Sequence, residues 1–259
     1  MRFRSLTLLP AALLLQAAPP DLLVPPPEAL RAPSGLVHRV TQAGRGGASP
    51  GPRDFVRVHF TGWGADGATF ANTRSLDEAP YLAMARLMPG LRESLLGMTL
   101  GEARRVWVPE ALAFAGAKGR PAGPVVMDLE LLDWVPDPAQ APMEVAAPPA
   151  DATFLRSGLA FKVLKAGTGK ARPARSSWVS VHYTGWTTDG AMFDSTLTKG
   201  TSVPLQLKAT IEGWIEGLQL MVVGERRRFW IPEKLAYRGA SGMPKGMLVF
   251  DVELVGISQ

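Results

Sequence analysis

Val181-His182-Tyr183-Thr184-Gly185-Trp186 repeats, with one substitution, the stretch Val58-His59-Phe60-Thr61-Gly62-Trp63 that lies 123 positions earlier. The same offset of 123 relates four further pairs of short motifs: Ser34-Gly35-Leu36 and Ser157-Gly158-Leu159, Asp66-Gly67 and Asp189-Gly190, Pro109-Glu110 and Pro232-Glu233, and Asp128-Leu129-Glu130-Leu131 and Asp251-Val252-Glu253-Leu254. The offset holds without a gap over roughly 100 residues, so the chain contains a duplicated unit.

The duplication predicts two domains of ordinary size. We place the first copy at residues 34–135 and the second at 154–259. A proline-rich stretch, 19–33, precedes the first copy, and a stretch rich in proline and alanine, 136–153, separates the two. Such compositions are typical of semi-extended linkers, which is our interpretation of both.

Residues 1–18 have the layout of a secretory signal peptide. Arg2 and Arg4 precede an apolar run from Leu6 to Leu15, which ends in small residues, and the run is too short to span a bilayer. We therefore expect a periplasmic or secreted protein with no stable membrane insertion after removal of the leader. An uncleaved leader or a wrongly assigned N-terminus is the alternative.

The composition excludes several classes of protein. The 259 residues include no cysteine, which rules out a disulfide scaffold and a thiolate metal site. Three scattered histidines are too few for a metal cluster, so we expect neither a metal nor a cofactor. The net charge is 28 − 23 = +5, too small to indicate nucleic-acid binding.

Hydrophobic periodicity in the second copy predicts an α+β unit. Period-two alternation marks strands, and helical spacing begins after Thr210, a plausible N-cap. The predicted strands span residues 159–164, 178–183, 205–207, 226–231 and 247–257. We expect each copy to form a curved antiparallel sheet wrapped around one short helix.

Two groups of polar residues suggest chemistry when they are taken alone. His59 and His182 alternate away from the apolar face of their strands, so we interpret them as solvated or hydrogen-bonding rather than catalytic. Arg226 to Arg228 point to alternate faces of a strand, which favours a solvated strand with occasional ion pairs over a basic patch.

The second copy resembles the FK506-binding-protein (FKBP) type of peptidyl-prolyl isomerase. Five motifs occur in the family's order and near its spacing: Val181-His182-Tyr183-Thr184-Gly185; Asp189-Gly190 followed by Phe193-Asp194-Ser195; Ile211-Glu212-Gly213-Trp214-Ile215-Glu216-Gly217-Leu218; Ile231-Pro232 with Ala236-Tyr237; and Leu248-Val249-Phe250-Asp251-Val252-Glu253-Leu254.

The resemblance implies an aromatic pocket with named residues. Trp214 would form its floor, Tyr237 would place a hydroxyl near the bound amide, and Asp194 would be its one acidic group; these three are the candidate catalytic residues. The candidate substrate-binding residues are Tyr183, Phe193 and Phe250 as walls, Ile211 through its backbone amide, and Val203 and Met243 as further wall positions.

The implied activity is cis–trans isomerisation of Xaa-Pro bonds in exported proteins. Its partners would be unfolded or proline-containing polypeptides, and FK506-like macrolides would be ligands. Rotation about a prolyl bond needs no nucleophile, because the enzyme has only to favour the twisted amide. The alternative is a non-catalytic chaperone or partner-binding protein that retains the fold.

The first copy keeps the frame and loses the pocket. Five aromatic or acidic positions change there, to Phe60, Ala71, Leu91, Phe114 and Met127. We therefore expect a degenerate domain with little isomerase activity. The second copy also departs from the family, because Met243-Pro244-Lys245-Gly246-Met247 stands where relatives usually carry Ile-Pro-Pro. That difference leaves substrate preference and drug affinity open.

Overall fold

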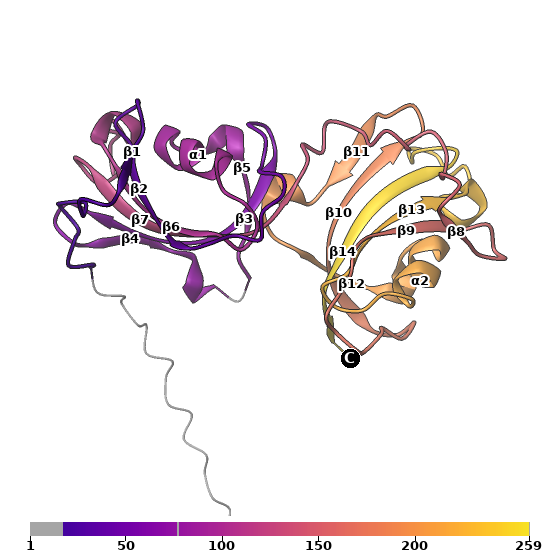
Figure 1. Cartoon of the computed structure of the whole chain (residues 1–259). Helices are drawn as coiled ribbons and strands as arrows, with labels where there is room; N and C mark the ends of the chain where they lie inside the picture. The colour runs from indigo at the N-terminus through magenta and orange to yellow at the C-terminus, as the bar shows by residue number, and fades with distance from the viewer. Residues whose placement is uncertain (1–17, 77, 259) are drawn as a thin grey trace, which may run out of the picture. The chain divides into compact units, whose positions relative to one another are not determined.

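The computed structural model of the chain describes residues 18–76 and 78–258, and these form two compact units (Figure 1). The first unit holds most described residues up to Asp133, and the second holds those from Trp134 onward together with Pro50–Val56 and Pro80–Arg86. The predicted leader lies, except for Ala18, outside the described residues. No helix in the described part of the chain is long and apolar enough to cross a membrane.

A seven-stranded sheet forms the first copy. Its strand order is β1-β2-β6-β7-β3-β4, and β5 pairs with β3. The strands are β1 (Leu30–Arg31), β2 (Val37–Gln42), β3 (Phe55–Gly64), β4 (Thr69–Asn72), β5 (Tyr81–Ala83), β6 (Ala103–Val108) and β7 (Val125–Val135). The helices are α1 (Pro89–Leu96) and the 3₁₀ turns η1 (Thr73–Ser75), η2 (Met84–Arg86) and η3 (Glu110–Leu112).

The second copy repeats this design. Its sheet has the order β11-β10-β14-β13-β9-β8, and β12 pairs with β10. The strands are β8 (Thr153–Phe154), β9 (Ala160–Lys165), β10 (Trp178–Thr187), β11 (Met192–Ser195), β12 (Val203–Gln206), β13 (Arg226–Ile231) and β14 (Leu248–Ser258). The helices are α2 (Glu212–Leu218) and the 3₁₀ turns η4 (Leu197–Lys199), η5 (Leu207–Ala209) and η6 (Glu233–Leu235).

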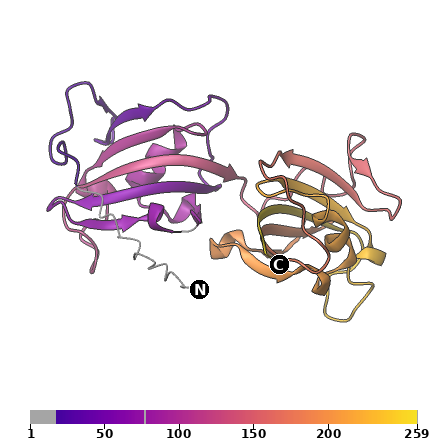
Figure 2. The same ribbon diagram turned by 90° about the horizontal axis from the view of Figure 1, so that it is seen from below.

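Each helix packs on one face of its own sheet. Figure 1 shows α1 and α2 against the curved sheets, and Figure 2 shows the first sheet from its other face, with its strands in front of the helix. In the second unit, β14 alternates as predicted: Leu248, Phe250 and Val252 belong to one buried cluster with Trp214 of α2, whereas Val249 packs on the opposite side. The α+β prediction is confirmed.

The start of α2 differs from the prediction. The N-cap residue is Ile211, which makes no side-chain capping bond, and not Thr210. The Thr210 hydroxyl instead donates to the carbonyl of Leu207, 2.8 Å away, in the preceding 3₁₀ turn. Thr210 is the C-cap residue of that 3₁₀ turn, and the N-cap position of α2 falls on the next residue.

The two proline-rich stretches that were interpreted as linkers pack against the sheets. Trp107 donates its indole N–H to the carbonyl of Asp21 at 2.8 Å, and Trp230 donates to the carbonyl of Glu144 at the same distance. Both pairs are related by the offset of 123. We call these two segments, residues 19–33 and 136–153, the straps, and we propose that each belongs to the repeat that follows it.

Candidate active site

A cavity of about 570 Å³ lies in the second unit beside α2. Seven of the nine site residues predicted from the sequence line it: Tyr183, Phe193, Asp194, Ile211, Trp214, Tyr237 and Phe250. They come from β10, β11, β14, α2 and the turn after η6, so the fold gathers residues that are up to 67 positions apart in the chain.

Val203 and Met243 do not line this cavity. Val203 lies in β12, opposite Val181 of β10, and packs on the edge of the core. Met243 is 39% exposed in the loop that precedes β14. Their contact with a substrate therefore stays a prediction.

Four aromatic rings form the lining through edge-to-face contacts. The ring of Tyr183 lies 5.1 Å from that of Trp214, at an interplanar angle of 83°. Phe250 lies 5.4 Å from Trp214 and also 5.4 Å from Phe193. Edge-to-face pairs are the favoured geometry for aromatic rings, so each ring fixes the next. The result is a preorganised apolar surface.

Two glycines make room for these rings. A Cβ on Gly185 would lie 2.6 Å from the ring of Phe193 and 2.7 Å from that of Phe250. A Cβ on Gly213 would lie 2.4 Å from Ile231 of β13, so this glycine lets α2 approach the sheet closely. Because Trp214 follows Gly213 directly, the close packing of helix on sheet sets the depth of the cavity floor.

The polar groups of the cavity are few. The Tyr183 hydroxyl donates to Oδ2 of Asp194. Burial, strengthened by this hydrogen bond, raises the pKa of Tyr183 well above its ordinary value. Burial and the charge of Asp194 also raise the pKa of Tyr237. Both hydroxyls therefore stay protonated at neutral pH and can donate hydrogen bonds.

Two N–H groups at the cavity have no acceptor within the described chain. One is the backbone amide of Ile211, which precedes the first residue of α2. The other is the indole Nε1 of Trp214, a buried atom without a partner. A carbonyl-rich ligand would offer acceptors to such donors, since a buried donor without a partner is costly.

Six further residues line the cavity that were not predicted as site residues: Leu205, Ala209, Thr210, Glu212, Ala236 and Arg238. Most of them stand directly beside a predicted residue in the chain. Glu212 follows Ile211, and Arg238 follows Tyr237. Adjacency to the motifs was therefore the signal that could have found them.

Comparisons with known proteins agree with the fold and with the repeat. The family described as FKBP-type peptidyl-prolyl cis-trans isomerase matches the chain twice, at residues 46–132 and 169–255. The chain belongs to the FKBP family.

Individual relatives cover one copy or both. An FKBP-type isomerase, FkpA, from Aeromonas hydrophila is 48% identical over 106 residues, which are 40% of this chain and 39% of that protein. A 22 kDa FKBP-type isomerase from Escherichia coli is 47% identical over 105 residues, 39% of this chain and 50% of that protein. The mouse isomerase FKBP9 is 30% identical over 213 residues, 78% of this chain and 34% of that protein. The chain thus spans half or less of these relatives.

The first FKBP copy has different side chains at the positions that line the cavity in the second. Phe114, which corresponds to Tyr237, packs edge-on against Phe70 at 5.4 Å. In the second copy no ring contact joins Tyr237 to the corresponding Phe193. Leu91 replaces the tryptophan floor and is buried. With Ala71, Phe60 and Phe114 at the positions of Asp194, Tyr183 and Tyr237, the first copy also lacks that aspartate and both tyrosine hydroxyls.

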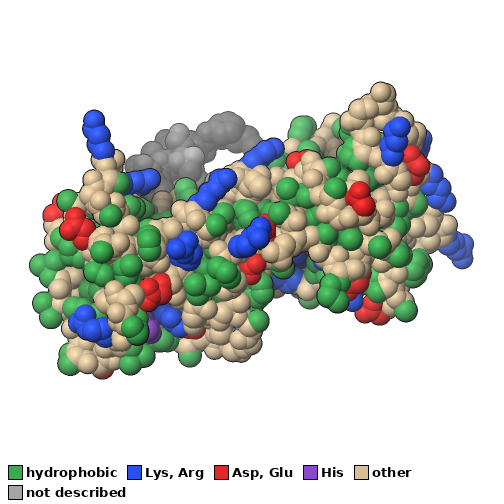
Figure 3. Space-filling view, turned by 90° about the horizontal axis from the view of Figure 1, so that it is seen from above, with side chains coloured by type: hydrophobic (Ala, Val, Ile, Leu, Met, Phe, Trp, Pro, Cys, Tyr) green, Lys and Arg blue, Asp and Glu red, His purple; other side chains and the backbone are tan. Residues whose placement is uncertain are grey.

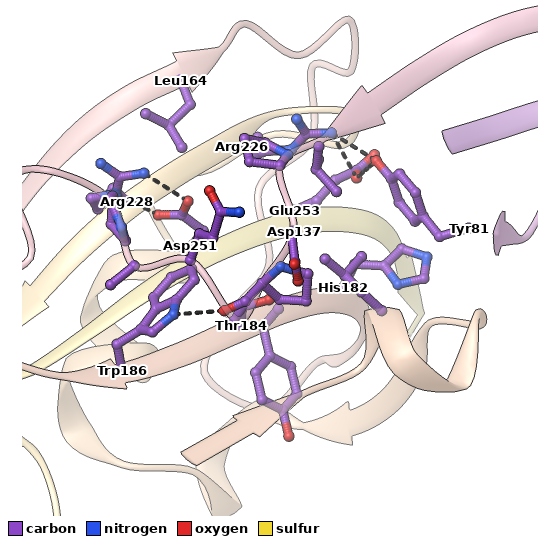
Figure 4. Close-up of a pocket in the computed structure, with 18 of the residues that line it drawn as sticks. Tyr81, Asp137, Leu164, His182, Thr184, Trp186, Arg226, Arg228, Asp251 and Glu253 are labelled. Carbon is purple, nitrogen blue, oxygen red and sulfur yellow. Dashed lines mark hydrogen bonds and ion pairs between the residues drawn. The ribbon is translucent and has the colours of Figure 1, made fainter. Parts of the chain in front are cut away.

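A second cavity, of about 450 Å³, lies in the second FKBP unit on the sheet face away from α2 (Figure 4). Its strap residues include Pro138, whose carbonyl accepts a hydrogen bond from the indole of Trp186 at 2.9 Å. His182, also in its lining, is buried and lies 3.4 Å from the hydroxyl of Thr196. Of the two interpretations of His182, the hydrogen-bonding one is confirmed and the solvated one is wrong.

Two arginines of this outer cavity pair with acidic residues that also line it. Arg228 makes two hydrogen bonds to Asp251, at 2.7 and 2.9 Å. Arg226 contacts the hydroxyl of Tyr81 at 2.7 Å and Glu253 at 3.4 Å, as Figure 4 shows. Both arginines are largely buried, so the expected solvated strand is wrong at these positions. These ion pairs link the neighbouring strands β13 and β14.

The rest of the described surface carries no concentrated charge on the face seen in Figure 3, where basic and acidic side chains are interspersed. No group of three or more acidic or histidine side chains within the described residues is arranged to hold a metal ion.

Proposed function

We propose that the second FKBP copy catalyses cis–trans isomerisation of Xaa-Pro bonds in unfolded polypeptides. The observation that carries this proposal is the gathering of Tyr183, Asp194, Trp214, Tyr237 and Phe250 around one apolar cavity. All five positions carry other residues in the first copy, which we therefore expect to be nearly inactive.

The chemistry required is modest and matches the lining. Rotation of a prolyl bond faces a barrier of roughly 20 kcal/mol because resonance gives the C–N bond double-bond character. The twisted amide loses that resonance and is less dipolar than the planar one, so an apolar cavity favours it over the ground state. The amide of Ile211 supplies a donor for a substrate carbonyl. The hydroxyl of Tyr237 supplies a second donor near the bond that rotates.

We propose further that the protein acts outside the cytosol. The predicted leader at residues 1–18 supports this, and a relative from Legionella longbeachae, 40% identical over 109 residues, is named outer membrane protein MIP. A mature protein that lacks the leader, measured by mass spectrometry after isolation from its cells, is the expected result. An intact N-terminus in the cytosolic fraction would contradict export.

The test of catalysis uses the first copy as a template. Asp194→Ala, Trp214→Leu and Tyr237→Phe together give the second cavity the residues found at Ala71, Leu91 and Phe114. We expect the triple variant to lose about 100-fold in kcat/KM, since each tenfold corresponds to about 1.4 kcal/mol of lost transition-state stabilisation. The assay is protease-coupled isomerisation of a proline tetrapeptide.

Two further measurements on the triple variant are needed: its fold and its remaining isomerisation rate. Circular dichroism of the triple variant should show an unchanged fold, because the first copy forms the same fold with these residues. The rate that remains reports the first copy, which we expect to contribute little. A triple variant as active as the parent protein would refute the pocket assignment.

The loss of the pocket in the first copy favours one alternative, a non-catalytic chaperone or partner-binding protein. The same triple variant separates the two functions. If the protein suppresses aggregation of a proline-free unfolded polypeptide equally well before and after the change, that activity does not use the cavity. FK506-like macrolides are proposed as ligands of the cavity, since its aromatic lining and the free amide of Ile211 suit an apolar, carbonyl-rich ring.

A further inference from the structure

Arg238 is a charged residue of the cavity that the proposed reaction leaves without a role. It lines the cavity beside Tyr237 and is exposed. Its Nε donates to the carbonyl of Lys234 at 3.0 Å, which holds the base of the guanidinium. Its two Nη groups have no partner within the described chain. A guanidinium held in this way presents a two-pronged donor toward solvent.

The backbone at this position is costly for any residue with a Cβ. Arg238 has φ of 54°, in the left-handed region that favours glycine. The equivalent residue of the first copy, Ala115, has φ of 46° and makes the same turn: the amides of both residues donate to a glutamate carbonyl at 3.2 Å. Because alanine forms this turn equally well, the arginine side chain is not needed for the turn.

The other charges of the cavity lining are already engaged. Glu212 accepts hydrogen bonds from both Nη groups of Arg175, at 3.1 and 3.3 Å. Asp194 accepts a hydrogen bond from the hydroxyl of Tyr183. Arg238 is thus the one charged lining residue, among those that the structure describes, that makes no ion pair or hydrogen bond to a charged group; its charge acts on Glu212 only at longer range. The guanidinium of Arg238 is therefore available to a negatively charged group of a bound peptide.

We propose that Arg238 is a specificity residue that binds the carboxylate of an acidic side chain next to the substrate proline. This inference rests on the proposed isomerase function and names a substrate class for it, Xaa-Pro sequences with an adjacent Asp or Glu. Arginine suits this role because its planar fork matches both oxygens of a carboxylate. The pair is exposed, so its effect on kcat/KM is modest, about two- to fivefold, and salt weakens it.

The experiment compares matched substrates. Tetrapeptides carry Glu, Gln or Lys immediately before the proline in one set and immediately after it in another, and kcat/KM is measured for the full chain. Glu and Gln have the same shape, so their ratio isolates the charge. We expect the Glu peptide to exceed the Gln peptide by about two- to fivefold in one set, with Lys lowest, and the preference to shrink at 0.5 M salt.

Two variants assign the preference to one side chain. Arg238→Ala should bring the Glu-to-Gln ratio to about one, and Ala115 shows that alanine fits this turn. Lys234→Ala removes the same charge from an exposed neighbour that does not line the cavity, and it should keep the ratio. Equal ratios in the parent protein and in Arg238→Ala would overturn the inference and leave the isomerase intact. A parent protein that accelerates none of the peptides would overturn the proposed function and this inference with it.

Discussion

At the residue scale, the role of Asp194 depends on its neighbour. Alone in the sequence it reads as a turn residue before Ser195, a common position for aspartate. In the fold its Oδ2 accepts a hydrogen bond from the hydroxyl of Tyr183. The first copy has Ala71 and Phe60 at these two positions, so both partners are missing there together. The hydroxyl donor and its carboxylate acceptor are therefore lost together in the first copy.

His59 gives the first unit a dependence of stability on pH. Burial, together with the positive charge of Arg74, lowers the pKa of His59 below its ordinary value of 6.5, and burial also lowers the pKa of His38. The unfolded chain therefore binds more protons than the folded one just below pH 6.5, so stability falls as the pH falls through that window. We predict that acidification from pH 7 to pH 5 destabilises the first unit.

Hydrogen exchange measures this effect strand by strand. After correction for intrinsic rates, amides of β2 and β3, which carry the two histidines, should lose protection between pH 7 and pH 5. Amides of β13, which has no histidine, are the reference, and His59→Gln should reduce the loss in β3. Equal loss in all three strands, or no change with the variant, would contradict the assignment to His59.

At this scale, the sequence pattern did not predict partners that lie outside the side chain's own helix or strand. Thr210 matched a capping pattern, yet its hydroxyl bonds to the preceding 3₁₀ turn. Arg227 was expected to be solvated, but it is 7% exposed, because Glu225 binds its Nε at 2.7 Å and Phe161 of β9 covers its guanidinium at 4.4 Å. Alternation tells which face a side chain takes, but it cannot tell what covers that face.

At the element scale, the position of α2 depends on small residues. A Cβ on Gly213 would meet Ile231 at 2.4 Å, closer than real contacts allow. We predict that Gly213→Ala pushes the helix from the sheet, costs about 1–3 kcal/mol of unfolding free energy, and lowers activity because Trp214 moves with the helix. Urea denaturation and the tetrapeptide assay measure the two effects.

Gly256→Ala is the matched control for this prediction. It lies in β14 of the same unit, and its added Cβ would lie 3.9 Å from Ser180, an ordinary contact. The same substitution there should leave activity unchanged. If Gly213→Ala kept both stability and rate, the close approach of the helix would not set the cavity floor.

Strands and the helix were largely predictable, and the straps were not. β13 begins and ends at the predicted residues 226 and 231, since the turn at Gly224 precedes it and Pro232 follows it. The straps lack any periodicity, because they consist largely of successive turns anchored by tryptophan N–H groups, and a series of turns has no repeating face. The signal lay in the repeat itself: Pro25-Pro26 and Pro148-Pro149 are also 123 positions apart.

At the scale of the whole molecule, duplication separates what the fold needs from what the cavity needs. Both copies keep the glycines that let helix and rings approach, such as Gly62 and Gly185, whose added Cβ atoms would meet a phenylalanine ring at 2.5 and 2.6 Å. Only the second keeps the tryptophan floor. Residues shared by the copies therefore maintain the frame, and residues that differ are the ones on which binding should depend.

This division predicts one binding site per chain. Isothermal titration of the full chain with a proline tetrapeptide or a macrolide should give a stoichiometry of one. Trp214→Leu, which copies the residue at Leu91, should abolish the heat of binding, because it removes the floor and two edge-to-face contacts.

The matched control is Leu91→Met in the first copy, a change of similar volume that a core tolerates at less than about 1.5 kcal/mol. It should leave both affinity and stoichiometry unchanged. A stoichiometry of two, falling to one in Trp214→Leu, would show that the first copy binds ligand without its aromatic floor, and the residues that differ would then not decide binding.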